Sequence, residues 1–322
     1  MPYTLSASLP TLRQRAAMLA SVRAFFAQRG VLEVETPALS SAGVTDPAIE
    51  SVTATVMRLG SAPHYLQTSP EFAMKRLLAA GSGDIYQLCR VFRDDELGRW
   101  HQPEFTMLEW YRVGWDEQKL MTEVEELVGA ALAAAAPGTA VRSVRVRYAD
   151  ALHAVLGVHP DAATAELARR LAVQGIDVPG GLGHDALLDL AFATRVVASF
   201  DPAALTFVYD YPPSQAALAR LKPGPPAVAA RFELFSGGIE LANGFHELTD
   251  PREQRRRFEA ERARRVREGH RAPPLDEAFL AALEAGLPDC AGVALGVDRL
   301  VALATNQTGV ASAMSFAHGD GG

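Results

Sequence analysis

The spacing of apolar residues along the chain predicts one helix near the N-terminus and another after Trp115. Residues 11–29 place apolar side chains at helical intervals, and Gly30 follows them as a stop. The pattern from Trp115 to Ala136 is again helical and ends in an alanine-rich run. The apolar stripe predicted for the first helix consists of Leu12, Ala16, Leu19, Val22 and Phe26.

Two further stretches predict hairpins, because they combine strand-forming residues with turn or loop residues. Residues 85–92 and 105–111 flank a charged loop. Residues 231–250 form the second hairpin, with a turn at Ser236, Gly237 and Gly238. Charges beside a buried sheet cost desolvation energy unless they are paired or meet a ligand. The loop of the first hairpin is therefore either a solvated tip or part of a binding site.

Two predicted helix starts carry charged side chains that bear on function. The run from Thr68 to Gly81 begins with capping residues, and Glu71 is either a first-turn stabiliser or a carboxylate that meets a ligand. After the small residues at 290–296, Asp298 is expected to cap an apolar helix. Arg299 lies near the same helix start and opposes the helix dipole, which favours an anionic partner for its guanidinium.

The chain is expected to form one domain over residues 1–322, with a mostly helical insertion around 115–230. No internal repeat or sharp change of composition marks a second domain. Residues 252–271 predict a charged helix with more arginine than glutamate. Such a helix is usually a solvated face held by ion pairs four residues apart. The alternative is a docking surface for an acidic partner.

Composition argues against several classes of protein. The 322 residues carry a net charge of −7, which disfavours a general nucleic-acid-binding surface. Cys89 and Cys290 form no CxxC pair, so neither a disulfide framework nor a zinc site is expected. No apolar run is long enough to span a membrane, and the N-terminal residues lack the blocks of a signal peptide. We therefore expect a cytoplasmic protein with no membrane partner.

The candidate chemistry is phosphate and amine binding without a covalent enzyme intermediate. Neither GxxxxGK[ST] nor GxGxxG is present, so Arg93 and Arg299 are the candidates to hold phosphate through their forked guanidinium groups. Glu233 and Glu240 are candidate ligands of Mg²⁺, which prefers oxygen donors and bridges substrate phosphates. Phe105 is suited to stacking on a purine. The residues expected to receive a cationic amine are Glu71, Tyr111 and Glu247.

Three motifs resemble the catalytic core of class II aminoacyl-tRNA synthetases of the lysyl type. They are VLEVETP at 31–37, FRDDELGRWHQPEFTMLEWY at 92–111 and GVALGVDRL at 292–300. The segment GIELANGFHELTD resembles the metal and amino-acid region of the lysyl subgroup. Motif 1 begins at Val31, so no anticodon-binding domain is expected, and Ala294 stands where lysyl-tRNA synthetases usually have glycine. The chain thus resembles the elongation factor P–(R)-β-lysine ligases, a family similar to truncated lysyl-tRNA synthetases.

The resemblance implies an α+β fold, with an antiparallel sheet flanked by helices, and a homodimer joined through the motif 1 region. It also implies an enzyme that uses ATP and Mg²⁺ to activate (R)-β-lysine as an adenylate. The acyl group would then pass to a lysine ε-amino group of elongation factor P. Two alternatives stay open, namely transfer of lysine to tRNA or another carrier, and a non-catalytic regulatory paralogue that binds ATP or an amino acid. Stable tRNA binding is not expected.

The same resemblance assigns roles to individual residues. Arg93 would bind the α-phosphate and Arg299 the γ-phosphate, and both would be catalytic. Asp95 and Gln102 replace the Glu and Asn that are common in the family, so we expect altered geometry with ATP binding retained. The implied ATP-binding residues are Arg93, Asp94, Asp95, His101, Gln102, Phe105, Glu240, Leu241, Gly296 and Arg299. The implied amino-acid-binding residues are Ser69, Pro70, Glu71, Tyr111, Asn243 and Glu247, and the implied metal ligands are Glu233 and Glu240.

Overall fold

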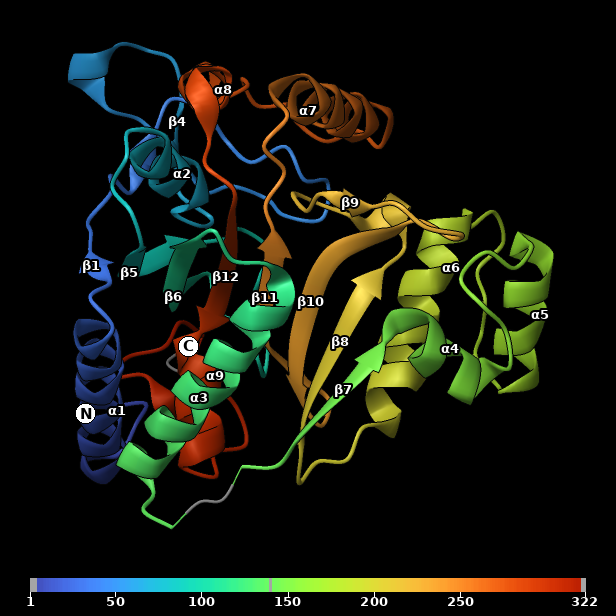
Figure 1. Ribbon diagram of the computed structural model, residues 1–322, viewed down its shortest axis with the longest axis horizontal. Coiled ribbons are helices and arrows are strands. Elements are labelled where there is room, and N and C mark those ends of the chain that lie inside the picture. Colours follow the sequence, from blue (N-terminus) through green and yellow to red (C-terminus); the bar gives the residue numbers. More distant parts are fainter. Residues whose placement is uncertain (1–4, 139–140, 320–322) are drawn as a thin grey trace.

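A mixed nine-stranded sheet forms the centre of the computed structural model, which describes residues 5–138 and 141–319 (Figure 1). The strand order is β1-β5-β6-β12-β11-β10-β8-β7, with β9 paired to β10. The strands of this sheet are β1 (Leu32–Glu33), β5 (Ile85–Phe92), β6 (Glu104–Val113), β7 (Ser143–Arg147), β8 (Leu205–Tyr211), β9 (Leu221–Lys222), β10 (Val228–Ser236), β11 (Ile239–His246) and β12 (Cys290–Gly296). A smaller sheet contains β2 (Leu39–Ser40), β3 (Thr53–Ala54) and β4 (His64–Leu66).

The central strands pair in antiparallel fashion, as expected. β5 pairs with β6 from Ile85 opposite Tyr111 to Phe92 opposite Glu104, so the first predicted hairpin is confirmed. β10 pairs with β11, which confirms the second hairpin. The edge strands β1 and β7 run parallel to β5 and β8. The parallel pairs join segments that are far apart in sequence, which turn residues do not reveal.

Helices cover the sheet in three groups (Figure 1). The helices α1, α3 and α9 lie together on one side, while α4, α5 and α6 form a lobe beside β7 and β8. The helices α2, α7 and α8 gather at one end of the sheet. The helices are α1 (Leu9–Gln28), α2 (Glu71–Ala79), α3 (Glu117–Ala135), α4 (Tyr148–Leu156), α5 (Thr164–Val173), α6 (His184–Ala191), α7 (Pro251–Arg267), α8 (Glu277–Gly286) and α9 (Val297–Ala304).

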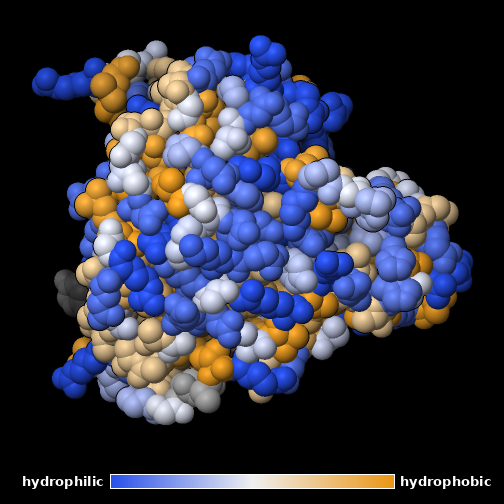
Figure 2. Space-filling model, viewed as in Figure 1, coloured by the Kyte–Doolittle hydropathy of each residue, from blue (hydrophilic) through white to orange (hydrophobic). Residues whose placement is uncertain are grey.

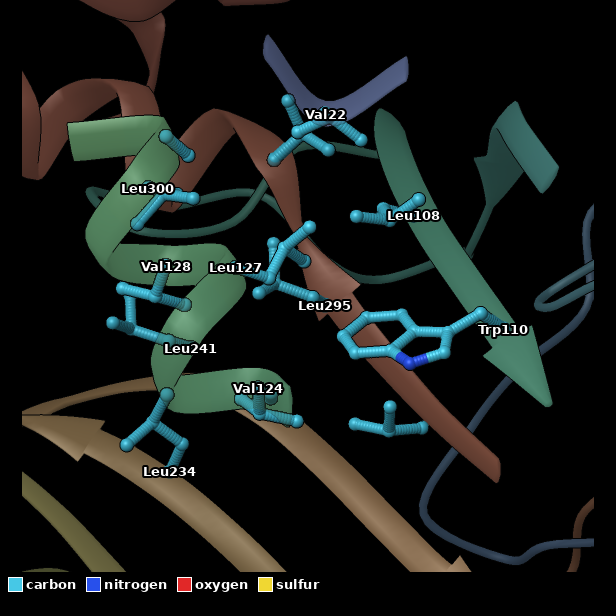
Figure 3. Packing of buried hydrophobic residues seen from close by; sticks show 14 of the residues in the cluster. Val22, Leu108, Trp110, Val124, Leu127, Val128, Leu234, Leu241, Leu295 and Leu300 are labelled. Carbon is cyan, nitrogen blue, oxygen red and sulfur yellow. The ribbon is translucent and has the colours of Figure 1, made fainter. Parts of the chain in front are cut away.

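The largest buried hydrophobic cluster lies between helices α1, α3 and α9 and the sheet. Figure 3 shows Leu127 of α3 on the side that faces Leu108 and Trp110 of β6, and Val124 and Val128 of the same helix belong to the same cluster. All five side chains are buried. Burial of such side chains contributes about 1.5–3 kcal/mol each relative to leaving them in water. This core fixes the central strands, whose other face and ends carry the polar residues of the site.

Helix α1 is confirmed, but one residue of its predicted inward stripe is wrong. Ala16 is exposed, whereas Met18, Val22 and Phe25 are buried against the core. The larger apolar side chains remove more surface from water than an alanine does, so they set the rotation of the helix. Ser8 caps α1, since its Oγ accepts a hydrogen bond from the Thr11 N–H at 3.2 Å.

The region around 115–230 contributes strands as well as helices. It contains α3 and the lobe of α4, α5 and α6, and it also supplies β7, β8 and β9 of the main sheet. β8 pairs with β10 through Glu233 opposite Val208. The region is therefore built into the sheet next to the strand that carries a predicted metal ligand.

Asp298 does not cap α9, contrary to the sequence expectation. Its Oδ2 accepts a hydrogen bond from the Thr106 N–H at 2.6 Å, and its Oδ1 lies 2.6 Å from Nη1 of Arg15. Arg15 also donates to the Thr106 hydroxyl at 2.8 Å and belongs to α1. A buried carboxylate needs a charged partner, and the nearest cation comes from a distant helix that the local pattern does not report. Asp298 therefore joins α1, β6 and α9.

Candidate active site

One cavity of about 700 Å³ opens between the central strands, α2 and α7. It draws together residues from both predicted hairpins and from the strand–helix segment at 290–304. Burial of many polar groups around a single concave space is typical of a binding site. The sequence-predicted residues that line it are Ser69, Pro70, Glu71, Arg93, His101, Gln102, Phe105, Tyr111, Glu233, Glu240, Leu241, Asn243, Glu247, Gly296 and Arg299.

Two arginines and an aromatic ring form one end of the cavity. The Arg93 guanidinium lies 5.2 Å from the centre of the Phe105 ring, and its Nη1 is 3.3 Å from Oε1 of Glu96. Arg299 donates from Nη1 to the Glu240 carbonyl at 2.9 Å and from Nε to the Trp100 carbonyl at 3.1 Å. Carbonyl groups hold Arg299 in place without cancelling its charge. This end is therefore suited to an anion beside a flat ring.

The same positive charge acts on His101. Burial is the largest cause that lowers the pKa of His101, and the nearby charge of Arg299 lowers it further. A neutral imidazole leaves the positive charge of this end on the two arginines. Neutral His101 also keeps one ring nitrogen as a hydrogen-bond acceptor.

A pair of carboxylates lies between the two ends of the cavity. Burial raises the pKa of Glu240 to about 7, and the charge of Glu233 adds to this effect. Glu233 accepts a hydrogen bond from the Tyr211 hydroxyl at 2.7 Å and forms an ion pair with Arg231. The two glutamates come close because the β10–β11 register shifts after Leu234, which places Phe235 opposite Glu240. Glu233 has partners of its own, whereas the Glu240 carboxylate has no hydrogen bond or ion pair among the described residues, and a cation between the two would favour the ionised form of Glu240.

A buried lysine bridges two of the predicted amine-binding carboxylates. Lys75 is 1% exposed, and its Nζ lies 2.6 Å from Oε1 of Glu71 and 2.6 Å from Oε2 of Glu247. Burial disfavours the ammonium form, but the charges of Glu247 and Glu71 outweigh it, so the pKa of Lys75 is raised. Burial raises the pKa of Glu247 to about 7 even though Lys75 opposes this change. The trio keeps one excess negative charge when all three groups are ionised.

A third carboxylate, Glu109, faces the same end of the cavity. Its Oε2 accepts from the Ser69 hydroxyl and its Oε1 from the Tyr111 hydroxyl, both at 2.6 Å. Burial raises the pKa of Glu109 to about 8, with the charge of Glu71 as the second cause. Ser69 also accepts from the Glu71 N–H at 3.0 Å, which ties this cluster to the start of α2. Buried acids that share a space in this way attract an ammonium group.

A glycine on strand β12, Gly292, leaves the space in which the side chains of this cluster pack together. A Cβ on Gly292 would lie 2.2 Å from Cε1 of Tyr111 and 2.5 Å from Oε1 of Glu247, closer than atoms approach. Asn243, on the neighbouring strand, accepts from Nε of Arg231 at 3.2 Å. Gly292 therefore lets the Tyr111 ring and the Glu247 carboxylate lie against strand β12.

Two predicted residues, Asp94 and Asp95, do not line the cavity, and a third, Gln102, uses its side-chain oxygen in a hydrogen bond within the protein. Asp94 and Asp95 are exposed in the loop and do not line the cavity. Asp94 instead accepts from the Asp95 N–H at 3.0 Å, and Asp95 adopts a positive φ of 59°. Gln102 lines the cavity, but its Oε1 accepts from the His318 N–H at 2.8 Å. Its side-chain oxygen therefore contacts the C-terminal segment.

Several functional residues were missed by sequence reasoning. Lys75 follows Glu71 by four residues on a predicted helix, which is the spacing of an ion pair and could have been noticed. Glu109 is the one charged residue in the run 107–111 of strand β6, whose other members are apolar or aromatic, and this position also marks it. The glycines at 290–296 do indicate a close approach of the backbone to a ligand or a neighbouring strand, but only the fold shows that Tyr111 and Glu247 are the side chains that converge on Gly292.

Comparison with known proteins agrees with the geometry. The family model of tRNA synthetases class II (D, K and N) matches residues 6–319. The elongation factor P–(R)-β-lysine ligase of Vibrio vulnificus is 50% identical over 318 residues, covering 97% of this chain and 96% of that protein. Ligases of the same name from Vibrio cholerae and Salmonella paratyphi B are 47% and 45% identical, with the same coverage. The chain therefore belongs to the class II tRNA synthetase family and, within it, to the elongation factor P–(R)-β-lysine ligases.

Proposed function

We propose that this protein joins (R)-β-lysine to a lysine side chain of elongation factor P at the expense of ATP. The observation that carries the proposal is one cavity that has arginines and Phe105 at one end and buried acids at the other. A nucleotide and an amino acid can meet in such a space. The relatives that bear the ligase name cover nearly the whole chain, so the same activity is the first one to test here.

In the first step, a carboxylate oxygen of β-lysine attacks the α-phosphorus of ATP, and pyrophosphate leaves. Arg93 and Arg299 are proposed to neutralise the phosphate charge, because their guanidinium groups border the cavity and keep most of their charge. Arg93 has one ion pair, with Glu96 at 3.3 Å, and Arg299 donates to backbone carbonyls. Phe105 is proposed to stack on the adenine. The side chains act by positioning and charge neutralisation, which are the main sources of catalysis in phosphoryl and nucleotidyl transfer.

Amino-acid recognition is assigned to the acidic end of the cavity. Glu71, Glu247 and Glu109 lie around the fixed ammonium of Lys75, and they leave negative charge for the amino groups of β-lysine. Tyr111 orients Glu109 through its hydroxyl. Ser69, Pro70 and Asn243 complete the wall. We propose that this end selects a cationic amino acid by charge and hydrogen bonding.

The residues present fit a magnesium ion that is shared with substrate phosphate. Glu240 lines the cavity, burial and the charge of Glu233 raise its pKa, and a nearby cation would favour the ionised form of both. Within the described residues no group of three or more acidic, histidine or cysteine side chains forms a metal site by itself. Glu233 and Glu240 would therefore hold Mg²⁺ together with phosphate oxygens, and the ion would offset phosphate charge.

In the second step, the neutral ε-amine of the acceptor lysine attacks the acyl carbon of the adenylate. The bond from the acyl carbon to the phosphate oxygen breaks, AMP leaves, and the attacking nitrogen loses a proton. An amide bond to the acceptor side chain results. The products are pyrophosphate from the first step and AMP from the second.

Intact mass spectrometry tests the proposal directly. Incubation of the protein with ATP, Mg²⁺, (R)-β-lysine and unmodified elongation factor P is expected to add one β-lysyl group to the factor. Omitting either ATP or β-lysine should abolish the gain. A folded acceptor that gains no mass under these conditions would refute the proposal.

Transfer of lysine to tRNA is the second candidate, because the matching family model describes tRNA synthetases. Efficient charging of tRNA with α-lysine, together with no modification of the factor, would favour it. A non-catalytic paralogue is a third reading, and amino-acid-dependent exchange of pyrophosphate into ATP would refute it. We propose that stable tRNA binding is absent, since the net charge of −7 disfavours it.

We also propose a homodimer formed through the motif 1 region. Helix α1 and strand β1 carry two large apolar residues that face outward, Leu9 at 58% and Leu32 at 55% exposure. Exposed apolar side chains on adjoining elements favour a covered surface.

None of the helices in the described ranges has both the length and the apolar character required to cross a membrane.

A further inference from the structure

Helix α7 forms part of the cavity wall with one face and the molecular surface with the other. Phe258 and Glu261 on its inner face line the cavity. Arg265, which is 1% exposed, donates to the carbonyls of Asp46 and Ile49 at 2.8 and 3.0 Å. The helix is therefore fixed rigidly to the loop that borders the cavity. Anything that binds the outside of α7 is held beside the active site.

The outward surface of the helix is basic with a small apolar centre, and we call it the α7 outer face. Four arginines stand there against one glutamate, on a chain whose net charge is −7. Figure 2 shows mainly hydrophilic atoms where Figure 1 places α7. The exposed residues of the α7 outer face are Arg252, Arg256, Glu259, Ala260, Ala263, Arg264, Val266 and Arg267.

Two of these arginines have charge to offer a partner. Arg256 is paired with Glu253 and Arg264 with Glu268, at 2.7 and 2.8 Å. The guanidinium groups of Arg252 and Arg267 contact no carboxylate or carbonyl in the part of the chain that the structure describes. They stand at opposite ends of the helix, about 22 Å apart at 1.5 Å per residue. This distance is comparable to the width of the surface that one partner contributes to a typical protein–protein interface.

The position of Arg252 is informative in its own right. It lies in the first turn of α7, directly after Pro251, where a positive charge opposes the helix dipole and costs about 0.3–1 kcal/mol. Its backbone N–H donates to the Asp250 carboxylate at 2.9 Å, but its guanidinium group makes no hydrogen bond or ion pair within the described residues that would offset this cost. By the same reasoning, a glutamate at this position would stabilise the helix. A charge that the fold does not use is available for binding.

The chemistry of the face favours a protein partner over a nucleic acid. Ala260, Ala263 and Val266 make its centre apolar, and Val266 is 63% exposed. Protein interfaces combine an apolar centre with arginine at the rim, whereas binding to a phosphate backbone depends on cations along the whole surface. The arginines at both ends require acidic groups opposite them.

We infer that the α7 outer face is the docking surface for an acidic region of the protein that accepts the acyl group. The inference rests on the proposed function, because it concerns the second step and its acceptor. Docking on α7 would hold the acceptor beside the cavity wall formed by Phe258 and Glu261. Adenylate formation needs neither Arg252 nor Arg267, since neither lines the cavity.

Charge reversal at the two unpaired arginines separates docking from chemistry. The double variant Arg252→Glu/Arg267→Glu should exchange pyrophosphate into ATP at the wild-type rate. Its kcat/KM for unmodified elongation factor P should fall about tenfold at low salt, because rim charges steer association. The difference from wild type should shrink as salt rises. The variant Arg252→Gln/Arg267→Gln should show a smaller loss, which distinguishes charge reversal from loss of the side chains.

A matched control changes the same net charge elsewhere. The double variant Arg58→Glu/Arg169→Glu places its changes on the 3-10 helix at 57–59 and on α5, and it should transfer normally. Unchanged kcat/KM in the α7 variant, or an equal loss in the control, would overturn the inference. A selective loss of tRNA binding with normal transfer would overturn it as well. Failure of the proposed function is separate, because wild-type protein would then transfer no β-lysine at all.

Discussion

Replacing Lys75 by methionine would leave two buried carboxylates without the cation that joins them. Methionine has a similar length and fills the same space, so the change removes charge with little change of volume. Both ion pairs of Lys75, each at 2.6 Å, are lost together. Breaking a buried pair by removing one partner costs about 3–5 kcal/mol, and we expect a loss of unfolding free energy in that range at pH 8.

The loss should depend on pH, with a sign set by Glu247. In the folded protein the pKa of Glu247 is raised from 4.5 to about 7, so its neutral form is favoured there. The stability tied to that raised value is present at low pH and fades as pH rises through 7. Lys75 opposes the raised pKa, so its removal raises the pKa of Glu247 further. Because pH 8 lies only about one unit above the wild-type pKa, this increases the loss at pH 8 by at most about 1.4 kcal/mol relative to the loss at low pH.

Urea unfolding at pH 6 and pH 8, followed by tryptophan fluorescence, measures both effects. The Lys75→Met variant should be less stable than wild type at both values, with the larger loss at pH 8. Lys119→Met is the matched control, because Lys119 is exposed and its Nζ lies 3.9 Å from the centre of the Trp115 ring. It should lose less than about 1 kcal/mol, with no difference between the two pH values. A Lys75→Met loss below about 1 kcal/mol, or one that is larger at pH 6, would refute the reasoning.

Two further substitutions probe the two ends of the cavity. Gly292→Ala should abolish β-lysine-dependent pyrophosphate exchange while ATP still binds, because the new methyl group collides with Tyr111 and Glu247; calorimetry showing normal β-lysine binding would contradict this. Gln102→Ala should raise KM for ATP several-fold and leave kcat little changed, since the hydrogen bond to His318 holds the loop at 93–103 that borders the cavity. Deleting the chain from His318 onward should have the same effect, and the two changes together should add nothing further.

The two hairpins could be predicted from sequence, because local patterns determine them. Alternating apolar residues and a Gly-Gly turn fix the strand pair that carries Glu233 and Glu240. The distance between these two glutamates could not be predicted, because it depends on a register shift after Leu234. A bulge leaves little trace in composition.

The misplaced residues share a different physical cause. Asp298 was expected to cap its own helix, yet it bonds to Thr106 and Arg15, which lie 192 and 283 residues away in sequence. Asp94 and Asp95 match a family motif by position, but a positive φ at Asp95 belongs to an exposed loop conformation. Long-range pairing and backbone conformation are decided by the folded chain as a whole, and single-sequence patterns do not contain them.

The contacts of Asp298 also connect helix α1, which we propose as part of a dimer contact, with Arg299, which we propose to bind phosphate. The carboxylate is clamped by Arg15 of α1, while the next residue, Arg299, points into the cavity. Helix α1 carries the exposed Leu9 that we assign to the subunit contact. A second subunit that shifted α1 would therefore act on the ion pair between Arg15 and Asp298, which is the residue directly before Arg299. In the proposed dimer, the subunit contact and the candidate phosphate-binding arginine would be separated by one ion pair and one peptide bond.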